Sequence, residues 1–162
     1  DVEDPLLLTG EAMDGKEVIA KAKETGDLAA MRNVRSRQLA LAVIFGDFHR
    51  AEEYYVGLLP FESFPNIAMP VIEVWFLAGL TYINLARSAV GRKRRRYVRK
   101  SRSLVKDLEE CVKHGNGNCL DWLLLLKAEQ LSISKSSTAD AVRSAYDDAI
   151  HSSSRNGFVQ TA

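Results

Sequence analysis

The sequence predicts an all-α fold built from antiparallel helix pairs. The chain of 162 residues is 46% hydrophobic and contains only four prolines and ten glycines. Because glycine and proline destabilise helix interiors, their scarcity within long windows favours helices. The most informative segment is residues 45–55, where a Gly-Asp turn separates two helical patterns. There Gly46 is suited to a left-handed helix C-cap, and Asp47 can cap the next helix.

Three helices are expected in the first part of the chain. We place them at about residues 11–24, 27–45 and 48–59, followed by a loop at residues 60–65. Asp27 is positioned to cap the second of these helices. Four residues at 3.6-residue spacing give the second helix an apolar stripe, namely Met31, Val34, Leu41 and Phe45. In the third helix, Ala51 is small enough for a partner helix to approach closely, and the aromatic Tyr55 lies one turn further on.

Four more helices are expected after the loop. The fourth begins near Met69 and is apolar on several faces, which indicates a central position. One of these faces contains Ile72, Phe76, Gly79 and Ile83. The others are expected at about residues 93–113, 118–131 and 138–154, and Asn118 can cap the sixth. The buried stripe of the fifth is expected to be Tyr97, Leu104, Leu108 and Cys111. The inward positions of the seventh are expected to be Ala139, Val142, Tyr146 and Ala149.

Short loops pair the second helix with the third, the fourth with the fifth, and the sixth with the seventh. Such pairs recur about every 40–45 residues, which is typical of a tetratricopeptide-like solenoid. The spacing of Val142, Tyr146 and Ala149 repeats that of Ala51, Tyr55 and Leu58. The residues expected to pack between repeats are Gly46, Ala51, Tyr55, Gly79, Tyr146 and Ala149.

An ordered set of segments carries a resemblance to a known family. These segments are residues 25–27, 41–48, 76–80, 118–129, 145–150 and 156–158. Together they resemble the tetratricopeptide-like helical region of large multidomain signalling ATPases. The resemblance covers about residues 25–162. Because the sequence starts at Asp1 without a methionine and stops soon after an expected helix end, we expect residues 1–162 to be a single helical-repeat segment from a longer chain. In that family an AAA-type ATPase module precedes this region, and sensor domains with a histidine kinase or nucleotide cyclase often follow it.

The sequence departs from that family pattern in four places. Cys119 stands where the family commonly has an aromatic residue, and Asp121 where it commonly has a histidine. The basic run after Gly91 and the serine-rich loop at residues 132–137 are local elaborations.

Composition also limits the cellular location and the binding partners that we expect for this chain. The net charge is +1, so no overall field favours nucleic acid or acidic lipid. Two cysteines form no disulfide framework, which favours a reducing, intracellular and cytoplasmic location. No apolar run approaches the length of a membrane span, and we expect no membrane partner.

Two residue patterns could carry chemistry, and both are weak. Residues 10–16 have the spacing of a phosphate-binding loop, but Glu17 follows where that motif needs Ser or Thr for Mg²⁺. Cys111, His114 and Cys119 lie close in sequence, but a zinc site needs a fourth ligand, and buried packing cysteines are the simpler interpretation. We therefore expect no catalytic, cofactor-binding or metal-binding residues, and no cofactor.

The strongest charge pattern is a basic run at the start of the fifth helix. Its members are Arg92, Lys93, Arg94, Arg95, Arg96, Arg99, Lys100 and Arg102. One interpretation is a contact for nucleic acid, an acidic protein or phosphate. Another is a basophilic kinase site at Ser101 or Ser103. A solvated helix face is the simplest interpretation, and the run contains no aromatic platform for bases except Tyr97.

The leading functional hypothesis is a non-catalytic helical-repeat scaffold or protein-interaction region within a multidomain signalling ATPase or kinase. Its partners would be protein segments or neighbouring domains of the same chain. A second hypothesis is a fragment of an enzyme whose catalytic residues lie elsewhere in the parent chain. The third is a helical domain that uses the basic run at residues 92–102 to bind nucleic acid or an acidic partner. The net charge of only +1 disfavours binding of nucleic acid.

Overall fold

The computed structural model describes residues 4–10, 13–59 and 69–155 of the chain. These residues form seven α-helices, which confirms the predicted all-α class. They also contain one minimal antiparallel ladder, in which Thr9 pairs with Asp14 and Gly10 with Met13. The chain divides into two compact units, Asp1–Leu77 and Ala78–Ala162.

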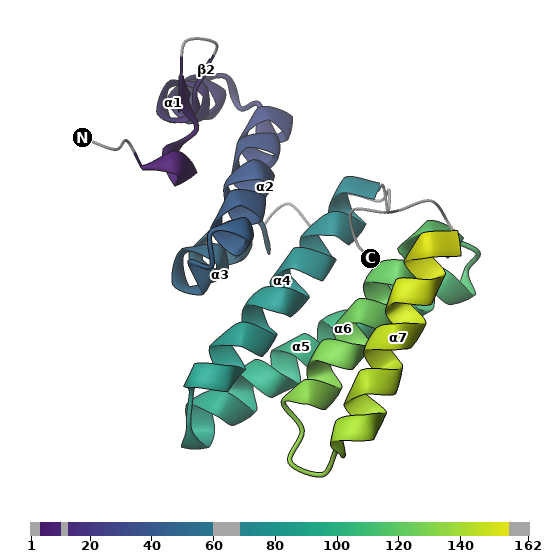
Figure 1. Ribbon diagram of the computed structural model, residues 1–162. Coiled ribbons are helices and arrows are strands. Elements are labelled where there is room, and N and C mark those ends of the chain that lie inside the picture. The colour runs from purple at the N-terminus through teal and green to yellow at the C-terminus, as the bar shows by residue number, and fades with distance from the viewer. Residues whose placement is uncertain (1–3, 11–12, 60–68, 156–162) are drawn as a thin grey trace. The chain divides into compact units, whose positions relative to one another are not determined.

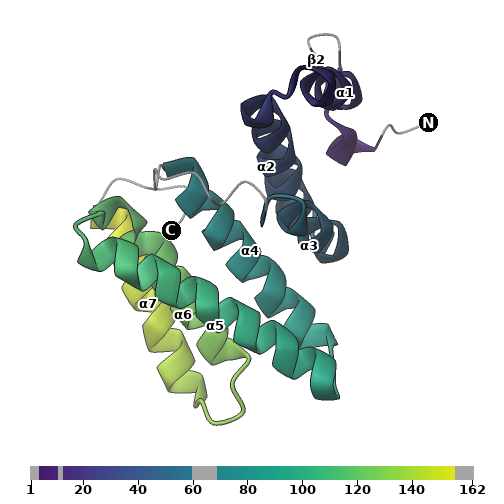
Figure 2. The same ribbon diagram turned by 180° about the vertical axis from the view of Figure 1, so that it is seen from behind.

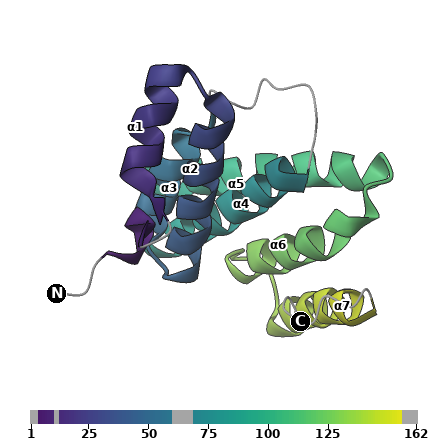
Figure 3. The ribbon, with the colours of Figure 1, turned by 90° about the horizontal axis from the view of Figure 1, so that it is seen from above.

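The first unit consists of helices that pack on their neighbours in the sequence. Its elements are η1 (Pro5–Leu7), β1 (Thr9–Gly10), β2 (Met13–Asp14), α1 (Gly15–Thr25), α2 (Leu28–Ile44), α3 (Phe48–Val56) and the first part of α4 (Met69–Ser88). Helix α1 contacts α2, and α2 contacts α3 (Figure 1). The chain reverses direction between α1 and α2, as Figure 3 shows from above. The second and third helices therefore pack against each other as expected.

The turn between α2 and α3 has the expected Gly-Asp geometry. Gly46 adopts φ +73°, which confirms the predicted left-handed residue. Its amide donates to the carbonyl of Val43 (3.1 Å), and the amide of Asp47 donates to the carbonyl of Ala42 (2.8 Å). This pair of bonds is the Schellman motif, which satisfies the last carbonyls of a helix. Asp47 then accepts a hydrogen bond from the amide of Arg50 (3.1 Å) and so caps α3.

The connection between α1 and α2 has the same geometry as the connection between α2 and α3. Gly26 is left-handed at φ +69°, and the amide of Asp27 donates to the carbonyl of Ala22 (2.8 Å). The carboxylate of Asp27 accepts from the amide of Ala30 (2.9 Å), as predicted for a cap. Gly-Asp thus ends one helix and starts the next at both turns.

A charged cluster holds the start of the first unit to α3. The guanidinium of Arg50 contacts the carboxylate of Asp4, and its Nε lies 2.7 Å from Oδ2 of Asp47. The hydrogen bonds from Arg50 lower the pKa of both carboxyl groups below the ordinary value of 3.8. Asp4 also accepts from the amide of Leu6 and so caps η1. One arginine therefore ties the N-terminal segment to a helix start.

The predicted apolar stripe of α2 is only partly correct. Val34 is buried, Met31 and Leu41 are half-buried, and Phe45 is 60% exposed. The helix ends at Ile44, and the chain turns at the next residues, so the Phe45 side chain leaves the line of the stripe. The face that is buried consists of Val34, Gln38, Leu39 and Ala42.

Helix α3 buries the two residues expected to pack there. Ala51 is fully buried and Tyr55 is 7% exposed. A side chain no larger than a methyl group at Ala51 permits close packing.

The second unit contains the rest of α4 and three further helices. Its other elements are α5 (Gly91–Lys113), η3 (Gly117–Cys119), α6 (Leu120–Ser132) and α7 (Ala139–Arg155). Helices α5, α6 and α7 run in alternating directions, and each contacts the next (Figure 2). The sixth and seventh helices therefore pack against each other as expected.

Close packing in the second unit depends on Gly79. A Cβ atom at this position would lie 2.7 Å from Cδ1 of Leu126, which is itself fully buried. The Leu126 side chain from α6 therefore packs directly on the α4 backbone at residue 79, and a side chain there would force Leu126 to move. Further along α4, the ring of Tyr82 stacks on that of Tyr97 from α5, with centroids 6.0 Å apart.

Polar contacts complete the packing of α6 against α7. The Tyr146 hydroxyl donates to Glu129 (2.8 Å), and the Ser152 hydroxyl donates to the buried carboxylate of Asp121 (2.5 Å). Ala149 is buried and Tyr146 is half-buried, so both expected packing residues face α6.

Several expected helix ends need correction. The sixth helix is not capped by Asn118, because the 3-10 turn η3 occupies that position and α6 begins after Cys119 without a side-chain cap. Helix α1 begins at Gly15, where Asp14 caps it, rather than at residue 11. Helix α3 ends at Val56, short of residue 59.

Ala139 was expected to face inward, but it is exposed at the start of α7. The loop expected at residues 60–65 and the segment at residues 156–158 lie outside the described residues.

Candidate functional site

The basic run forms the first turns of α5, and the amphipathic pattern of that helix places its charges. The buried residues recur at helical spacing and are Tyr97, Ser101, Leu104, Val105, Leu108 and Cys111. The four apolar residues predicted for this stripe are among them. The cations occupy the remaining positions, so most of them face solvent.

Two lysines of the run pack on aromatic rings of the second unit. Lys100 donates from Nζ to the Tyr82 hydroxyl (2.8 Å) and lies 4.4 Å from the centroid of that ring. Lys93 lies 5.8 Å from the centroid of Tyr97. Cations over aromatic faces are attracted by the ring quadrupole. These two members of the run therefore support the packing of α4 and α5.

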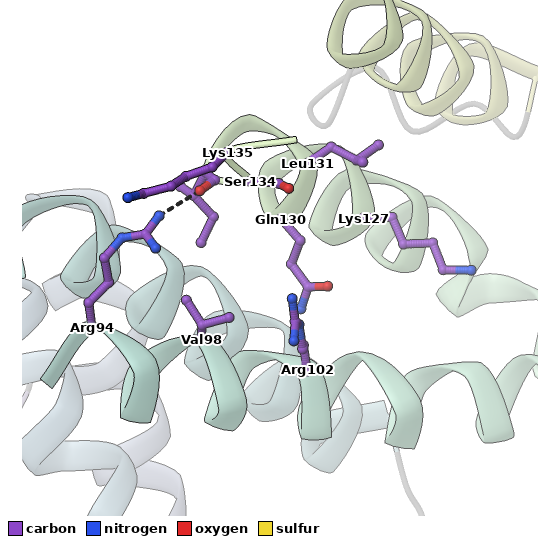
Figure 4. A pocket seen from close by; sticks show the side chains of 9 residues that line it. Arg94, Val98, Arg102, Lys127, Gln130, Leu131, Ser134 and Lys135 are labelled. Atoms are coloured by element: carbon purple, nitrogen blue, oxygen red, sulfur yellow. Dashed lines mark hydrogen bonds between the residues drawn. The ribbon is translucent and has the colours of Figure 1, made fainter. Parts of the chain in front are cut away.

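Arg94 joins the start of α5 to the loop after α6. Its Nη2 donates to the carbonyl of Ile133 (2.6 Å), as the dashed line in Figure 4 shows. This bond brings the basic run next to the serine-rich loop that follows α6.

A cavity of about 450 Å³ lies between α5, α6 and this loop. We call it the α5–α6 groove. Its lining residues come from three places in the chain and are Arg94, Val98, Arg102, Lys127, Gln130, Leu131, Ile133, Ser134 and Lys135 (Figure 4). Four of the nine are cations, and none is acidic or aromatic. The groove is therefore suited to a negatively charged ligand.

The four cations of the groove differ in how they are already engaged. Lys127 forms an ion pair with Glu109 on α5 (2.8 Å), and Arg94 holds the loop carbonyl. Arg102 and Lys135 are exposed and have no hydrogen bond or ion pair to any described residue. These two charges are therefore available to a ligand.

The cations of the predicted interaction patch therefore do not share one surface in the structure. Only Arg94 and Arg102 line the groove. The other six members lie outside it and are Arg92, Lys93, Arg95, Arg96, Arg99 and Lys100. The prediction treated the run as one surface, whereas the helix directs successive side chains about 100° apart.

The two serines considered as kinase sites also differ. Ser101 is fully buried, donates to the carbonyl of Val98 (3.0 Å) and accepts from Nε2 of Gln130 (3.3 Å). The interpretation of Ser101 as a kinase site is therefore wrong for the folded chain. Ser103 is exposed, and its phosphorylation stays a prediction.

Sequence reasoning missed the α6 side of the groove. Lys127 and Lys135 stand alone among apolar or serine residues, and neither forms a pattern by itself. The sequence contained one signal for this site, which was the presence of two segments of unusual composition, the basic run and the serine-rich loop. Only the antiparallel return of α6 along α5 brings them together.

Residues 11 and 12 of the segment with phosphate-loop spacing lie outside the described residues, and the rest of the segment belongs to β1, β2 and the start of α1. Asp14 accepts hydrogen bonds from the amides of Lys16 (2.7 Å) and Glu17 (3.3 Å). In a phosphate-binding loop, such amides would point at the phosphates. Here the carboxylate of Asp14 occupies them. A Cβ atom added at Gly15 would lie 2.7 Å from the carbonyl oxygen of Leu7, so no side chain fits at that position.

The cysteines and the nearby histidine have ordinary structural surroundings. Cys111 and Cys119 are buried free thiols, and burial raises the pKa of both. His114 is exposed, and its Nδ1 lies 2.7 Å from the carbonyl of Glu110. Among the described residues, no group of three or more His, Cys, Asp or Glu side chains could hold a metal ion.

Among the residues that the structure describes, none of the helices combines the length and the apolar character needed to cross a bilayer.

Comparison of the chain with protein-family models, with curated proteins and with solved structures gave no match.

Proposed function

We propose that this chain is a non-catalytic helical module that binds a protein segment or holds neighbouring domains in register. The observation that carries the proposal is the α5–α6 groove. It is an open, cationic cavity on a frame of packed helices, with two cations that engage no described residue. Rigid helical frames with open grooves are a recurrent means of binding peptide segments.

We further propose that the helix pairs belong to a tetratricopeptide-like solenoid. Contacts between successive helices, α1 with α2, α2 with α3, α5 with α6 and α6 with α7, support this arrangement. The repeated Gly-Asp turns and the close contacts at Ala51 and Gly79 are consistent with it. The resemblance in sequence suggests a place within a multidomain signalling ATPase or kinase.

The groove favours a protein partner over nucleic acid. Binding of single strands commonly uses aromatic side chains on which bases stack, and the groove lining contains none. A duplex is bound through contacts of many cations with phosphates spread along its backbone. The free cations Arg102 and Lys135 instead lie at a concave site.

Capture of partners from a cell extract tests the proposal. The immobilised chain should retain proteins that survive nuclease treatment and that are displaced by excess free chain. Retention that disappears after nuclease treatment would favour the nucleic-acid alternative. The absence of any protein displaced by free chain would contradict the interaction role.

A second measurement addresses nucleotide binding. Titration of the chain with MgATP in a calorimeter should give no heat of binding, because Asp14 occupies the amides of Lys16 and Glu17. Saturable binding that is lost in a Lys16→Ala variant would overturn this part of the proposal.

A further inference from the structure

The cations of the α5–α6 groove are arranged along a line rather than around a point. Arg94 and Lys135 lie at one end of the cavity, and Arg102 and Lys127 lie toward the other (Figure 4). Arg94 and Arg102 are eight residues apart on one helix, which places them about 12 Å apart along its axis. Arg94 is held at its end of the cavity by the bond to the Ile133 carbonyl, so the positive charges are spread along the site and do not converge on one point.

An aliphatic position separates the two charged ends. Val98 is one turn from Arg94 and one turn from Arg102, and it lines the same cavity. Leu131 and Ile133 add aliphatic surface from α6 and its loop. A ligand that fills the groove should therefore carry negative charge at both ends and an apolar group between them.

An extended peptide has these dimensions. Residues i, i+2 and i+4 of an extended chain face the same side, and i and i+4 are about 13 Å apart. We propose that the groove binds an acidic segment of a partner protein in extended conformation, with two Asp or Glu residues flanking an aliphatic residue at two-residue spacing. This inference rests on the proposed protein-interaction role and names the chemistry of the partner.

The state of each cation fits this ligand. Arg102 and Lys135 engage no described residue, and each can pair with one carboxylate of the segment. Arg94 uses one of its donors for the Ile133 carbonyl, and a guanidinium retains further donors for a carboxylate at the same end. With no acidic residue in the lining, nothing within the groove repels the ligand.

Fluorescence anisotropy with synthetic peptides tests the proposal on the complete chain. The probe is a labelled nine-residue peptide with Glu-Ala-Leu-Ala-Glu at its centre. In the first control peptide both Glu residues are replaced by Gln. In the second control peptide Leu is replaced by Ser. The variant Arg102→Ser with Lys135→Ser should weaken binding of the probe by about tenfold or more, because each loses a direct charge partner. Both control peptides should bind more weakly than the probe.

The matched variant Arg99→Ser with Lys106→Ser removes the same charge from exposed positions outside the groove. It should weaken binding of the probe clearly less than the groove variant does, because neither side chain lines the groove, although both lie about one helical turn from Arg102. All variants should keep the circular dichroism spectrum and melting temperature of the parent.

Three outcomes would overturn the proposal. They are equal loss in both variants, failure of the probe to bind, and displacement of the probe by inorganic phosphate or an oligothymidine as effectively as by unlabelled peptide. If the probe fails while the chain still captures a nuclease-resistant protein partner, the groove proposal is wrong and the interaction role stands. Failure of that capture would instead count against the proposed function itself.

Discussion

At the scale of single residues, two glycines determine where helices can turn and how closely they can pack. Gly46 is required for its backbone, with φ +73°, and no atom would contact an added Cβ. Gly79 is required for its lack of a side chain, because Leu126 occupies the space beside it. The same residue type therefore has two different physical roles, which distinct substitutions can separate.

The role of Gly46 predicts a loss of stability on replacement by alanine. Gly46→Ala should lower the free energy of unfolding by about 1 kcal/mol, because an L-residue is strained in the left-handed region. Urea unfolding followed by circular dichroism measures the change. Gly117→Ala is the control, since that glycine has neither a positive φ nor a neighbour within 4 Å of an added Cβ. Equal stability of Gly46→Ala and the parent would show that the turn tolerates a side chain.

The role of Gly79 predicts an overpacking effect that depends on its neighbour. Gly79→Val should destabilise the chain by about 1–3 kcal/mol, the usual cost of forcing extra methyl groups into a packed contact. In that background, Leu126→Ala should cost less than it does in the parent, because it opens space for the new side chain. A double-mutant cycle on unfolding free energies tests this, and strictly additive effects would contradict the contact.

At the scale of elements, the Asp4–Arg50–Asp47 cluster joins η1 to the start of α3. The hydrogen bonds from Arg50 keep the pKa of both carboxyls below 3.8 in the folded chain. In the unfolded chain these groups regain ordinary values, so the cluster favours folding while both are ionised. Its contribution is present above the unfolded pKa and disappears as the pH falls through the lower folded values. Both carboxylates are partly exposed, so the effect is modest and sensitive to salt.

This linkage predicts a difference in acid stability. Between about pH 5 and about pH 2, the parent should lose more stability than an Arg50→Gln variant, which has already lost the cluster. Urea unfolding across this range measures the two slopes. Arg143→Gln removes an exposed arginine without a described partner and should follow the parent. Parallel slopes for the parent and Arg50→Gln would contradict the role of the cluster.

Helices α2 and α5 show how far a sequence pattern predicts a buried face. On α5 the predicted residues Tyr97, Leu104, Leu108 and Cys111 are all buried. The eight cations of the run leave the helix only one apolar face, so the pattern has a single solution. On α2 apolar and polar residues are mixed around the axis, and Gln38 is buried while Phe45 is exposed. Contacts with α1 and with α3 decide which face is covered.

At the scale of the whole molecule, both compact units are built mainly from helices that contact their neighbours in sequence. The far-ultraviolet circular dichroism spectrum of the complete chain should therefore show the strong double minimum of helices. The two-residue ladder of β1 and β2 is too short to contribute visibly. A spectrum dominated by strand would contradict the architecture.

The sequence by itself was sufficient for the helical class, for both Gly-Asp turns and for the burial of Ala51 and Ala149. It was wrong about Gly46 as a packing residue, because Gly46 is exposed and acts through its backbone conformation. These features depend on local rules: the period of apolar residues, the backbone preference of glycine and the capping geometry of aspartate. The same rules reach only a few residues along the chain. They are sufficient where a structural feature is contained within one turn or one helix.

The groove was decided only by tertiary structure. Its charges come from α5, from α6 and from the loop beyond, and they share one cavity because α6 returns along α5 and Arg94 binds the Ile133 carbonyl. The same packing buries Ser101 and leaves Arg99 outside. A sequence pattern records which charges are close along the chain. Which of them face a common ligand depends on the packing of segments that are distant in sequence.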